Sequence, residues 1–520
     1  MKKQKWFYEK SNIASKDNPI NITYDELLHK SDSEVEEWID NLRDYVITQW
    51  DENGQPPVIG QNESEIISNW KKLFGYDVES FFDEKTKVVK NFNKYASGVN
   101  QFFPTMLKTK ISSGVSSEGA TSIYDHFKDD DLRDTFKKAM LRSLFKDSMY
   151  TFSLSVKVKE MGMSNVSDFL TQTNQDPTYG IMVVRQSDTK PVDINSQYLI
   201  LKKSEVEMYL STGCLTEQNL RTIGDELKDS YELKNGDKRY YHYYIRKYKR
   251  KQRIFPSALQ VFRLGLGQPA VNFPPLTAKF LYEHFTKHIK DSNLIISDPS
   301  SGWGGRILGA MSSDRNIHYV GIDPNPDNEG RYEAVADFYN EHCFNPNPFW
   351  GKAEPNTYEI FREGSEEVGN NPKFQKYKGK LDMVFTSPPY FNREQYSQDE
   401  NQSFKKFGAY DDWRDNFLKP TLTTMYTYLK PDRYLCWNIA DIKVGSDKYI
   451  PLEQDSIDIV ESLGGEYQGI YKMLMTRMVG IDASNVKNSV MIKSHPLSRG
   501  GDYFKFEPIL IFYKPKERRR

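Results

Sequence analysis

The sequence predicts an α/β protein whose C-terminal half forms a doubly wound, mainly parallel sheet. From about residue 255 onward, short apolar runs alternate with longer amphipathic stretches of helical period. Such alternation is typical of parallel strands joined by crossover helices. Three of the apolar runs end in glycine, proline or aspartate, residues that turn a chain sharply. Because ligands of open α/β sheets lie beyond the carboxyl ends of the strands, a functional site is expected there.

The expected elements follow one another along this half of the chain. Strands are expected at 293–299, 317–325, 347–355, 381–385, 433–442, 467–475 and 506–514. Helices are expected at 274–289, 305–313, 330–342, 413–430 and 451–464. The fourth helix should be interrupted near Pro420, because proline removes a backbone donor and clashes with the preceding turn.

Residues 1–250 are expected to form a separate, mainly helical α+β domain, since 520 residues exceed one ordinary core. A helix at 31–50 is expected to begin with a capping box of Ser33 and Glu36, and it carries apolar residues at helical spacing. Further elements of this domain are expected at 129–152, a helix, and at 197–203, a strand.

One segment of that domain, "KRYYHYYIRKYKRKQR" at 238–253, interleaves lysine and arginine with tyrosine. An ordinary solvated face has the same composition. The pattern also suits nucleic-acid contact, since cations meet phosphates and rings meet sugars or bases. The total charge does not decide between the two, because 71 Lys+Arg residues nearly balance 72 Asp+Glu residues.

Cysteine usage and hydropathy exclude several classes of protein. The three cysteines, Cys214, Cys343 and Cys436, are far apart and show no Cys-x-x-Cys or Cys/His spacing. Neither a metal site nor a disulfide framework is therefore expected. No apolar run approaches the ~18 residues that span a membrane, and the N-terminus has no apolar signal-peptide core. A cytoplasmic protein without a membrane partner is expected.

Two strand ends carry residues suited to a nucleotide. The first expected strand runs into "DPSSGWGGR" (298–306), where Gly302 and Gly304 permit a tight turn and close backbone approach to a ligand. The second ends at Asp323, which is placed to accept hydrogen bonds from two ribose hydroxyls. Each also has a plainer interpretation: a strand–helix connection in the first case, and an aspartate opening a turn before Pro324 in the second.

A third strand end carries "TSPPYF" at 386–391. Two successive prolines cannot pair within a strand, since neither has a backbone donor. They therefore end the apolar run 381–385 and hold a small polar residue and two aromatics on a stiff turn. Taken alone, such a turn is equally explained as a rigid connection with a packed tyrosine. Its place in the alternating series favours a catalytic role.

In this order, the three strand ends resemble the S-adenosylmethionine-dependent amino-methyltransferases of DNA, of phage or bacterial type. Their cofactor motif has the form D-P-F-x-G-x-G, and their catalytic motif is (D/N/S)-P-P-(Y/F/W). This chain has D-P-S-S-G-W-G at 298–304 and S-P-P-Y at 387–390. The resemblance covers roughly residues 255–515. It implies a seven-stranded, Rossmann-like methyltransferase domain at 251–520, with residues 1–250 serving target recognition or partner contact.

The resemblance implies roles for individual residues. Those on the catalytic turn are Ser387, Pro388, Pro389 and Tyr390. Those that bind S-adenosyl-L-methionine are Asp298, Pro299, Ser300, Gly302, Gly304, Asp323 and Glu354. Those that contact the substrate are Phe391, Lys487, Lys493 and Arg499. Two positions depart from the family pattern: Ser300 replaces a phenylalanine, and Glu354 stands where an aspartate near the adenine is common.

The implied activity is methyl transfer to the exocyclic amine of a base flipped out of double-stranded DNA. Serine in the first motif position favours N4 of cytosine over N6 of adenine. Methylation of cytosine C5 is disfavoured, because no cysteine nucleophile lies near the turn. An RNA base methyltransferase and a non-catalytic nucleic-acid-binding module with a decayed site are the alternatives; a protein glutamine methyltransferase would carry N-P-P-Y. No oligomeric state is predicted.

The spacing of the motifs bears on target recognition. Fewer than ~100 residues separate the cofactor motif from the catalytic motif, too few for a recognition domain of ordinary size. Recognition is therefore expected from residues 1–250, or from two long polar loops at 391–412 and 476–505. The implied setting is restriction–modification or phage DNA modification, in the cytosol of a bacterium or of a phage-infected host.

Overall fold

A computed structural model describes residues 20–146 and 270–516 of the chain. Within these ranges the gaps are 24–25, 28–29, 55, 58–61, 91–94, 96, 112–120, 291–292, 347–351, 392, 398, 445–447, 478–486 and 493–501. The strand expected at 197–203 and the basic segment at 238–253 lie outside the described residues.

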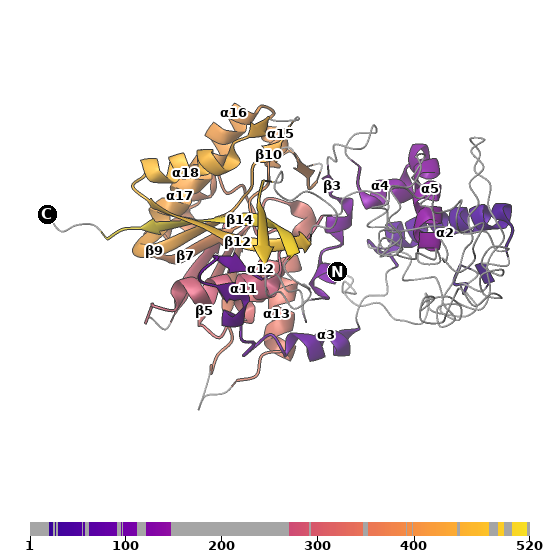
Figure 1. Cartoon of the computed structure of the whole chain (residues 1–520). Helices are drawn as coiled ribbons and strands as arrows, with labels where there is room; N and C mark the ends of the chain where they lie inside the picture. The colour runs from indigo at the N-terminus through magenta and orange to yellow at the C-terminus, as the bar shows by residue number, and fades with distance from the viewer. Residues whose placement is uncertain are drawn as a thin grey trace, which may run out of the picture. The chain divides into compact units, whose positions relative to one another are not determined.

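The chain divides into two compact units. The first contains residues 60–124 and 268–520, and the second contains residues 10–59 and 125–267. The sequence suggested a boundary near residue 250. The contacts instead add residues 60–124, from the expected N-terminal domain, to the unit that carries the sheet (Figure 1).

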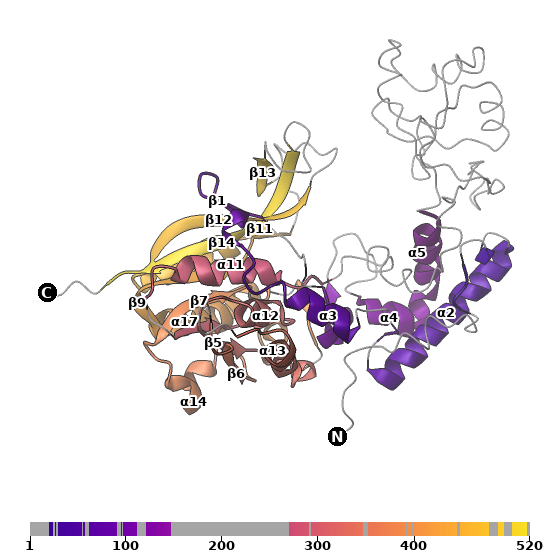
Figure 2. The same cartoon turned by 90° about the horizontal axis from the view of Figure 1, so that it is seen from below.

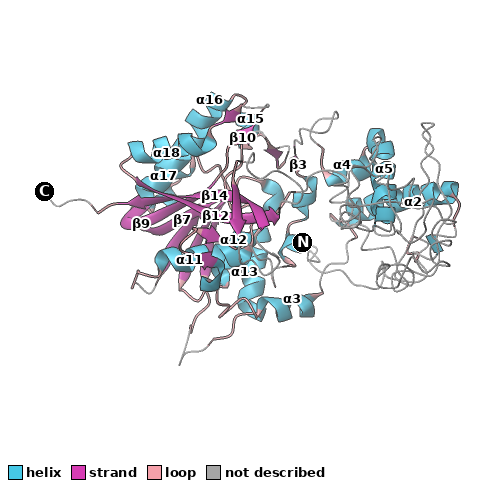
Figure 3. Cartoon of the chain, viewed as in Figure 1, coloured by secondary structure: helices cyan, strands magenta, loops and turns pink. Residues whose placement is uncertain are grey.

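One mixed sheet lies at the centre of the first unit (Figure 3). Its seven main strands, read across the sheet, are β6 (Thr357–Phe361), β5 (Ile317–Ile322), β4 (Leu294–Asp298), β7 (Leu381–Thr386), β9 (Leu429–Asn438), β14 (Asp502–Lys514) and β12 (Glu466–Arg477). The strands from β6 to β9 pair in parallel, and β14 is antiparallel to both of its neighbours. Numbered by chain order, these strands run 3-2-1-4-5-7-6. The predicted doubly wound, Rossmann-like sheet is confirmed.

Helices cover both faces of this sheet (Figure 1). They are α11 (Pro275–Thr286), α12 (Gly305–Met311) and α13 (Arg331–His342) on one face, and α17 (Lys419–Tyr428) and α18 (Leu452–Ser462) on the other. Successive side chains of a strand point to opposite faces. Along β7, Met383 and Phe385 accordingly pack in one core with Leu281, whereas Val384 packs in a second core with Leu422.

The helix expected at 413–430 is interrupted as predicted. α16 (Tyr410–Trp413) leads through a π-helical turn at Arg414–Leu418 into α17, with Pro420 in the first turn of α17. A wider turn accommodates the missing donor of the proline. The shorter elements of this unit include α14 (Pro372–Gln375), α15 (Ser403–Lys406), β10 (Ile442–Lys443) and β11 (Tyr449–Ile450).

The third strand does not lie where the sequence predicted it. Residues 352–356 are not strand, and β6 begins only at Thr357. The run before it contains the buried Lys352 and Asn356, which donate to backbone carbonyls of the loop after α12. The physical reason is that β6 is an edge strand, so most of its side chains are only partly buried and its sequence lacks the continuous apolar run of the central strands.

Part of the N-terminal sequence extends the sheet. After α3 (Glu63–Trp70), β1 (Phe82–Asp83) and β2 (Val88–Val89) form a hairpin, and β2 pairs in parallel with β12. Trp70 and Val89 are buried in the same core as α11. This segment is therefore integral to the sheet unit, because it both pairs with an edge strand and fills the core.

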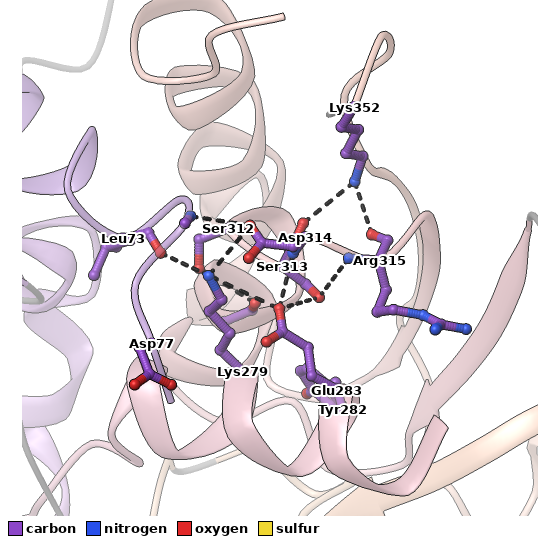
Figure 4. Close-up of polar contacts among 12 residues, drawn as sticks. Leu73, Asp77, Lys279, Tyr282, Glu283, Ser312, Ser313, Asp314, Arg315 and Lys352 are labelled. Atoms are coloured by element: carbon purple, nitrogen blue, oxygen red, sulfur yellow. Dashed lines mark hydrogen bonds and ion pairs between the residues drawn. The ribbon is translucent and has the colours of Figure 1, made fainter. Parts of the chain in front are cut away.

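A buried lysine ties this segment to the sheet (Figure 4). The amine of Lys279, on α11, donates to the Leu73 carbonyl at 2.8 Å and lies 3.4 Å from Asp314 Oδ1. Asp314 Oδ1 also accepts from the Gly75 N–H at 3.0 Å, and Glu283 Oε1 accepts from the Asp314 N–H at 2.8 Å. Asp314 precedes β5, so this cluster lies at the edge of the sheet where the parallel strands begin.

The second unit is described mainly through its helices. They are α2 (Asp32–Asn53), the end of α4 (Ile123–Lys128) and α5 (Arg133–Lys146), which falls within the helix expected at 129–152. The helix predicted at 31–50 is confirmed, but Ser31 and Glu34 form its capping box rather than Ser33 and Glu36. The helix begins earlier than predicted, because Ser31 already has the extended backbone of an N-cap.

A three-stranded ribbon continues from the sheet. β12 and β14 pair with each other, and β13 (Ser489–Ile492) pairs with the first residues of β14. Figure 2 shows these strands projecting away from the body of the sheet. One face of the ribbon packs Phe504 against Val88, while Met491 and Tyr503 on the other face are exposed. The second predicted loop is therefore partly strand.

Candidate active site

Two of the predicted turns leave the sheet side by side. β4 and β7 are neighbours that pair in parallel, with Ser297 opposite Val384. Thr386, the last residue of β7, donates a hydrogen bond from Oγ1 to Asp298 Oδ1, the last residue of β4, at 2.6 Å. The glycine turn after β4 and the S-P-P-Y turn after β7 therefore share one edge. From β4 the sheet winds in both directions, and ligands of such sheets bind at this switch point.

Asp298 is the centre of a buried network beneath the two turns. Its Oδ2 accepts from Arg306 Nε at 2.7 Å and from the Tyr319 hydroxyl at 2.6 Å. Burial raises the pKa of Tyr319 well above its ordinary value, so the hydroxyl stays a donor. Pro299 is buried, and the half-buried Ser300 donates its N–H to Asp298 Oδ1 at 3.3 Å. Both oxygens of Asp298 are occupied by protein donors, so this carboxylate shapes the turn from within.

The glycine turn needs its glycines. Gly302 and Gly304 have φ values of 64° and 80°, in the left-handed region that favours glycine. A Cβ on Gly304 would collide with the ring of Phe103, and the Gly302 carbonyl accepts from the Tyr332 hydroxyl at 2.6 Å. The predicted tight turn is confirmed. Phe103 comes from the N-terminal segment, which the sequence did not associate with this turn.

Asp323 lies just beyond β5, as predicted, and is half-buried. Its Oδ1 accepts from the Asn325 N–H at 2.9 Å and its Oδ2 from the Gly302 N–H at 3.2 Å. Burial raises the pKa of Asp323 to about 6. The Tyr332 hydroxyl is a further hydrogen-bond partner of this carboxylate. A carboxylate has about four acceptor positions, so acceptor capacity remains for a ligand. The position and chemistry of Asp323 therefore fit a vicinal diol such as the ribose of a nucleoside cofactor.

The S-P-P-Y turn is fixed to the sheet through its tyrosine. Pro388 is buried, whereas Ser387, Pro389 and Tyr390 are half-buried. The Tyr390 hydroxyl donates to Glu507 on β14 and lies 3.5 Å from the Asn438 carbonyl at the end of β9. Burial raises the pKa of Tyr390 well above its ordinary value. The turn thus places a serine and a tyrosine ring beside the glycine turn.

The chain after this turn is held by a second tyrosine. β8 (Glu394–Gln395) pairs with β3 (Lys110–Ile111) of the N-terminal segment. The Tyr396 hydroxyl donates to Glu394, and the Tyr396 ring lies 5.5 Å from the ring of Trp303 on the glycine turn. Burial raises the pKa of Glu394. The N-terminal segment therefore contributes to the surroundings of both turns.

Phe391 differs from its predicted role. Its side chain is 6% exposed and packs in the core against Trp413 and Tyr410, with ring centroids 5.9 Å and 5.7 Å away. The predicted contact of Phe391 with the substrate does not agree with this position. The reason is that its left-handed backbone, with a φ of 48°, turns the chain and carries the ring into the core.

Glu354 also requires a correction. It is exposed and precedes Thr357, the first residue of β6, which runs parallel to β5. Glu354 therefore lies at the edge where the strands begin, whereas Asp323 lies at the edge where they end. The expected contact of Glu354 with the cofactor followed from the misplaced third strand. The carboxyl end of the third main strand, where Glu354 was expected, is instead followed by the residues after Phe361.

The basic residues predicted to contact the substrate are only partly described. Lys487 precedes β13, and its amine lies 2.6 Å from Asp441 Oδ2 and 3.5 Å from Glu453 Oε1. Its charge is therefore shared with two carboxylates of the protein. Lys493 and Arg499 lie outside the described residues.

Several residues of the site escaped the sequence analysis. Phe103 comes close to the glycine turn only through tertiary contacts, so no local pattern marks it. Glu394 follows the catalytic turn directly in the chain, but its pairing with Ile111 of the N-terminal segment has no local signal. Glu507 had a detectable signal, because it is a charged residue within the apolar closing strand "FEPILIFYK". A buried charge in such a run commonly has a polar partner.

The described cysteines lie in the core. Cys436, expected in the core, is buried on β9, and burial raises the pKa of its thiol well above the ordinary value. Within residues 20–146 and 270–516, less the gaps, no cluster of His, Cys, Asp or Glu could hold a metal ion. In the same part of the chain no helix is long and apolar enough to cross a membrane.

Comparisons with known proteins address the class. Residues 381–520 match the DNA methylase family of N6/N4 methyltransferases. No curated protein matches the sequence. Among solved structures, precorrin-6y C5,15-methyltransferase from Geobacter metallireducens is 10% identical with a TM-score of 0.24, over 45% of this chain and 89% of that chain. A candidate DNA modification methylase from Thermus thermophilus, solved with S-adenosyl-L-methionine, is 19% identical with a TM-score of 0.18, over 30% of this chain and 56% of that chain.

The resemblance to DNA amino-methyltransferases is confirmed over the matched segment. This segment begins at Leu381, the first residue of β7, and includes the S-P-P-Y turn. The match supports methyltransferase chemistry of the DNA methylase type, with S-adenosyl-L-methionine as the cofactor. The matched family includes both N4 and N6 enzymes.

Proposed function

We propose that the protein transfers a methyl group from S-adenosyl-L-methionine to the exocyclic amine of a base flipped out of double-stranded DNA. N4 of cytosine is favoured over N6 of adenine, because the catalytic motif begins with Ser387. The observation that carries the proposal is the direct hydrogen bond between Thr386 and Asp298. This bond joins the ends of two neighbouring parallel strands. A methyl donor bound at the first turn would therefore lie next to a base bound at the second.

The first turn would hold the cofactor, which supplies an electrophilic methyl group on a sulfonium sulfur. Asp323 would accept hydrogen bonds from the ribose hydroxyls, and the left-handed Gly302 and Gly304 let the backbone approach the ligand. Asp298 and Arg306 would support this turn from within the protein. Their role is to orient the turn rather than to touch the cofactor.

The second turn would bind and activate the amine. The lone pair of such an amine is delocalised into the ring of the base, so the amine is a poor nucleophile. Acceptors aimed at its hydrogens favour a more tetrahedral nitrogen, and Ser387 Oγ and the Pro388 carbonyl would be those acceptors. The two prolines preorganise them before the reaction. The ring of Tyr390 would stack on the flipped base. The product proton is acidic, so it leaves to solvent without a strong base.

The rest of the duplex would contact basic and projecting parts of the chain. We include Lys487, Lys493 and Arg499 among these contacts, together with the basic segment 238–253 and the ribbon of β12, β13 and β14. A phosphate that bound Lys487 would replace Asp441 as its partner. The proposed setting is restriction–modification or phage DNA modification in the bacterial or phage-infected cytosol.

Methyl transfer from labelled S-adenosyl-L-methionine tests the proposal. Unmodified duplex DNA and RNA of the same base composition are incubated separately with the wild-type protein. Label in DNA supports the proposal. Label in RNA alone would replace it with an RNA base methyltransferase, and cofactor binding without any transfer to either would contradict both. Absence of cofactor binding in calorimetry would favour a nucleic-acid-binding module with a decayed site.

A further inference from the structure

Two tyrosine–glutamate pairs flank the chain that leaves the catalytic turn. The Tyr390 hydroxyl donates to Glu507 on β14, and the Tyr396 hydroxyl donates to Glu394 on β8. Both glutamates are half-buried, and the proposed chemistry uses neither. Removing a carboxylate from water is costly unless donors replace the water. The two pairs therefore need an explanation.

The electrostatic surroundings show that the glutamates depend on their tyrosines. Burial raises the pKa of Glu507, and the nearby charge of Glu394 raises it further. The hydrogen bond from Tyr390 and the charges of Lys505 and Arg393 act in the opposite direction. Two partly buried carboxylates that repel each other are thus held at the site with hydroxyl donors as their partners.

Tyr390 is anchored to the frame of the sheet rather than to the loop. Its hydroxyl meets Glu507 on β14 and the carbonyl of Asn438 on β9. These strands are antiparallel neighbours, and the Asn438 side chain donates to the Pro508 carbonyl at 3.0 Å. A ring fixed at both ends, by the proline turn and by its hydroxyl, keeps one orientation.

We propose that Glu507 is a positioning residue for methyl transfer, which holds the ring of Tyr390 in the orientation that stacks on the target base. This inference rests on the proposed function. Without the hydrogen bond the ring rotates about its side-chain bonds, and fewer bound bases are aligned for attack. Glu507 acts through Tyr390, so its loss should lower turnover and leave cofactor binding unchanged.

A set of four variants tests this role: Glu507→Ala, Glu507→Gln, Tyr390→Phe and the double variant Tyr390→Phe/Glu507→Ala. The kcat and KM for duplex DNA are measured together with the Kd for S-adenosyl-L-methionine. Glu507→Ala and Tyr390→Phe should each lower kcat about 10- to 100-fold, the effect of one hydrogen bond to a charged group. The double variant should be no slower than the slower single variant, because both changes remove the same bond. Glu507→Gln should stay within about threefold of the wild type, since its amide oxygen still accepts the bond.

The same strand offers a matched control. The Tyr513 hydroxyl donates to Asp432 Oδ1 at 2.7 Å, which is another tyrosine–carboxylate bond of β14, at the end of the strand far from Glu507. Tyr513→Phe should leave kcat, KM and Kd unchanged. A loss of kcat in this variant would show that any weakening of β14 slows the enzyme, and it would overturn the positioning role of Glu507.

The remaining outcomes separate this inference from the proposed function. A wild-type protein that methylates no DNA overturns the function and the inference with it. An active wild type with Glu507→Ala and Tyr390→Phe variants of unchanged kcat overturns the inference alone. If Glu507→Ala fails to fold, Glu507→Gln decides: a folded Glu507→Gln protein as slow as Tyr390→Phe would show that the hydrogen bond is not what matters.

Discussion

The two edges of the sheet use buried charges in different ways. At the edge where the parallel strands begin, Lys279 is 0% exposed. Its amine contacts the Leu73 carbonyl and the carboxylates of Asp314 and Glu283, so the protein itself supplies its partners (Figure 4). At the edge where the strands end, Asp323 is only half-buried. Its protein partners are two backbone N–H groups and the Tyr332 hydroxyl, and none of them is a cation. The buried charge at the first edge is neutralised by other residues of the protein. The carboxylate at the second edge can still accept hydrogen bonds from a ligand.

The difference shows that burial alone does not identify a functional residue. Burial lowers the pKa of Lys352 to about 7 at the first edge and raises the pKa of Asp323 to about 6 at the second. Both shifts are large, yet Lys352 donates to the carbonyls of Ser313 and Arg315 and has a structural explanation. Position at the carboxyl end of a strand, together with unused lone pairs, distinguishes the site.

The largest expected effect belongs to Asp298, which joins the two turns. Asp298→Ala should lower the free energy of unfolding by about 3–5 kcal/mol, because it leaves the buried Arg306 without its carboxylate. Methyl transfer should also be lost, since Thr386 and the glycine turn lose their common acceptor. Chemical denaturation and a transfer assay measure the two effects. A stable, active Asp298→Ala protein would contradict the central position of this network.

A smaller effect is expected at the opposite edge. Lys279→Met should lower the free energy of unfolding by about 2–3 kcal/mol, because Asp314 and Glu283 lose their cation and the Leu73 carbonyl loses a donor. Turnover and cofactor affinity of the folded protein should not change. Chemical denaturation measures the loss of stability, and a transfer assay with cofactor titration measures turnover and affinity. A change of kcat in fully folded Lys279→Met protein would show that this edge also serves catalysis and would contradict the comparison.

The smallest expected effect is a dependence of cofactor binding on pH. Asp323 accepts hydrogen bonds from hydroxyls best as a carboxylate, and its raised pKa of about 6 means that it gains a proton as the pH falls through 6. The Kd for S-adenosyl-L-methionine should rise about tenfold from pH 7.5 to pH 5. Calorimetric titration at several pH values measures it. Asp323→Asn should bind weakly at all of them without this trend; the same trend in that variant would assign it to another group.

Sequence reasoning succeeded where the signal is local. The glycines of the first turn and the prolines after β7 determine the local backbone by themselves. The aspartate after β5 is marked by its position directly at the end of a strand. Their mutual placement followed from one further rule, that parallel strands end at a common edge. The adjacency of β4 and β7 then required only the expected winding of the sheet.

The errors concern features that the tertiary structure decides. Glu354 was misplaced because β6 is an edge strand whose partly exposed side chains give no continuous apolar run. Phe391 was assigned to the substrate, whereas Trp413 and Tyr410 hold it in the core. The pairing of β2 with β12 links residues far apart in the chain, so no pattern within the N-terminal sequence could predict it.

The central claim is that the turn after β7 binds a base amine for methyl transfer. Analysis of nucleosides from methylated duplex DNA is the most direct test of this claim. DNA incubated with S-adenosyl-L-methionine and wild-type protein is digested, and its nucleosides are separated by mass spectrometry, in parallel with Ser387→Ala. We predict N4-methyl-2′-deoxycytidine with the wild type, and 10- to 100-fold less, as an order of magnitude, with Ser387→Ala at unchanged cofactor affinity. N6-methyl-2′-deoxyadenosine would change the base but keep the claim. Equal methylation by both proteins, or methylation of a carbon atom, would contradict it.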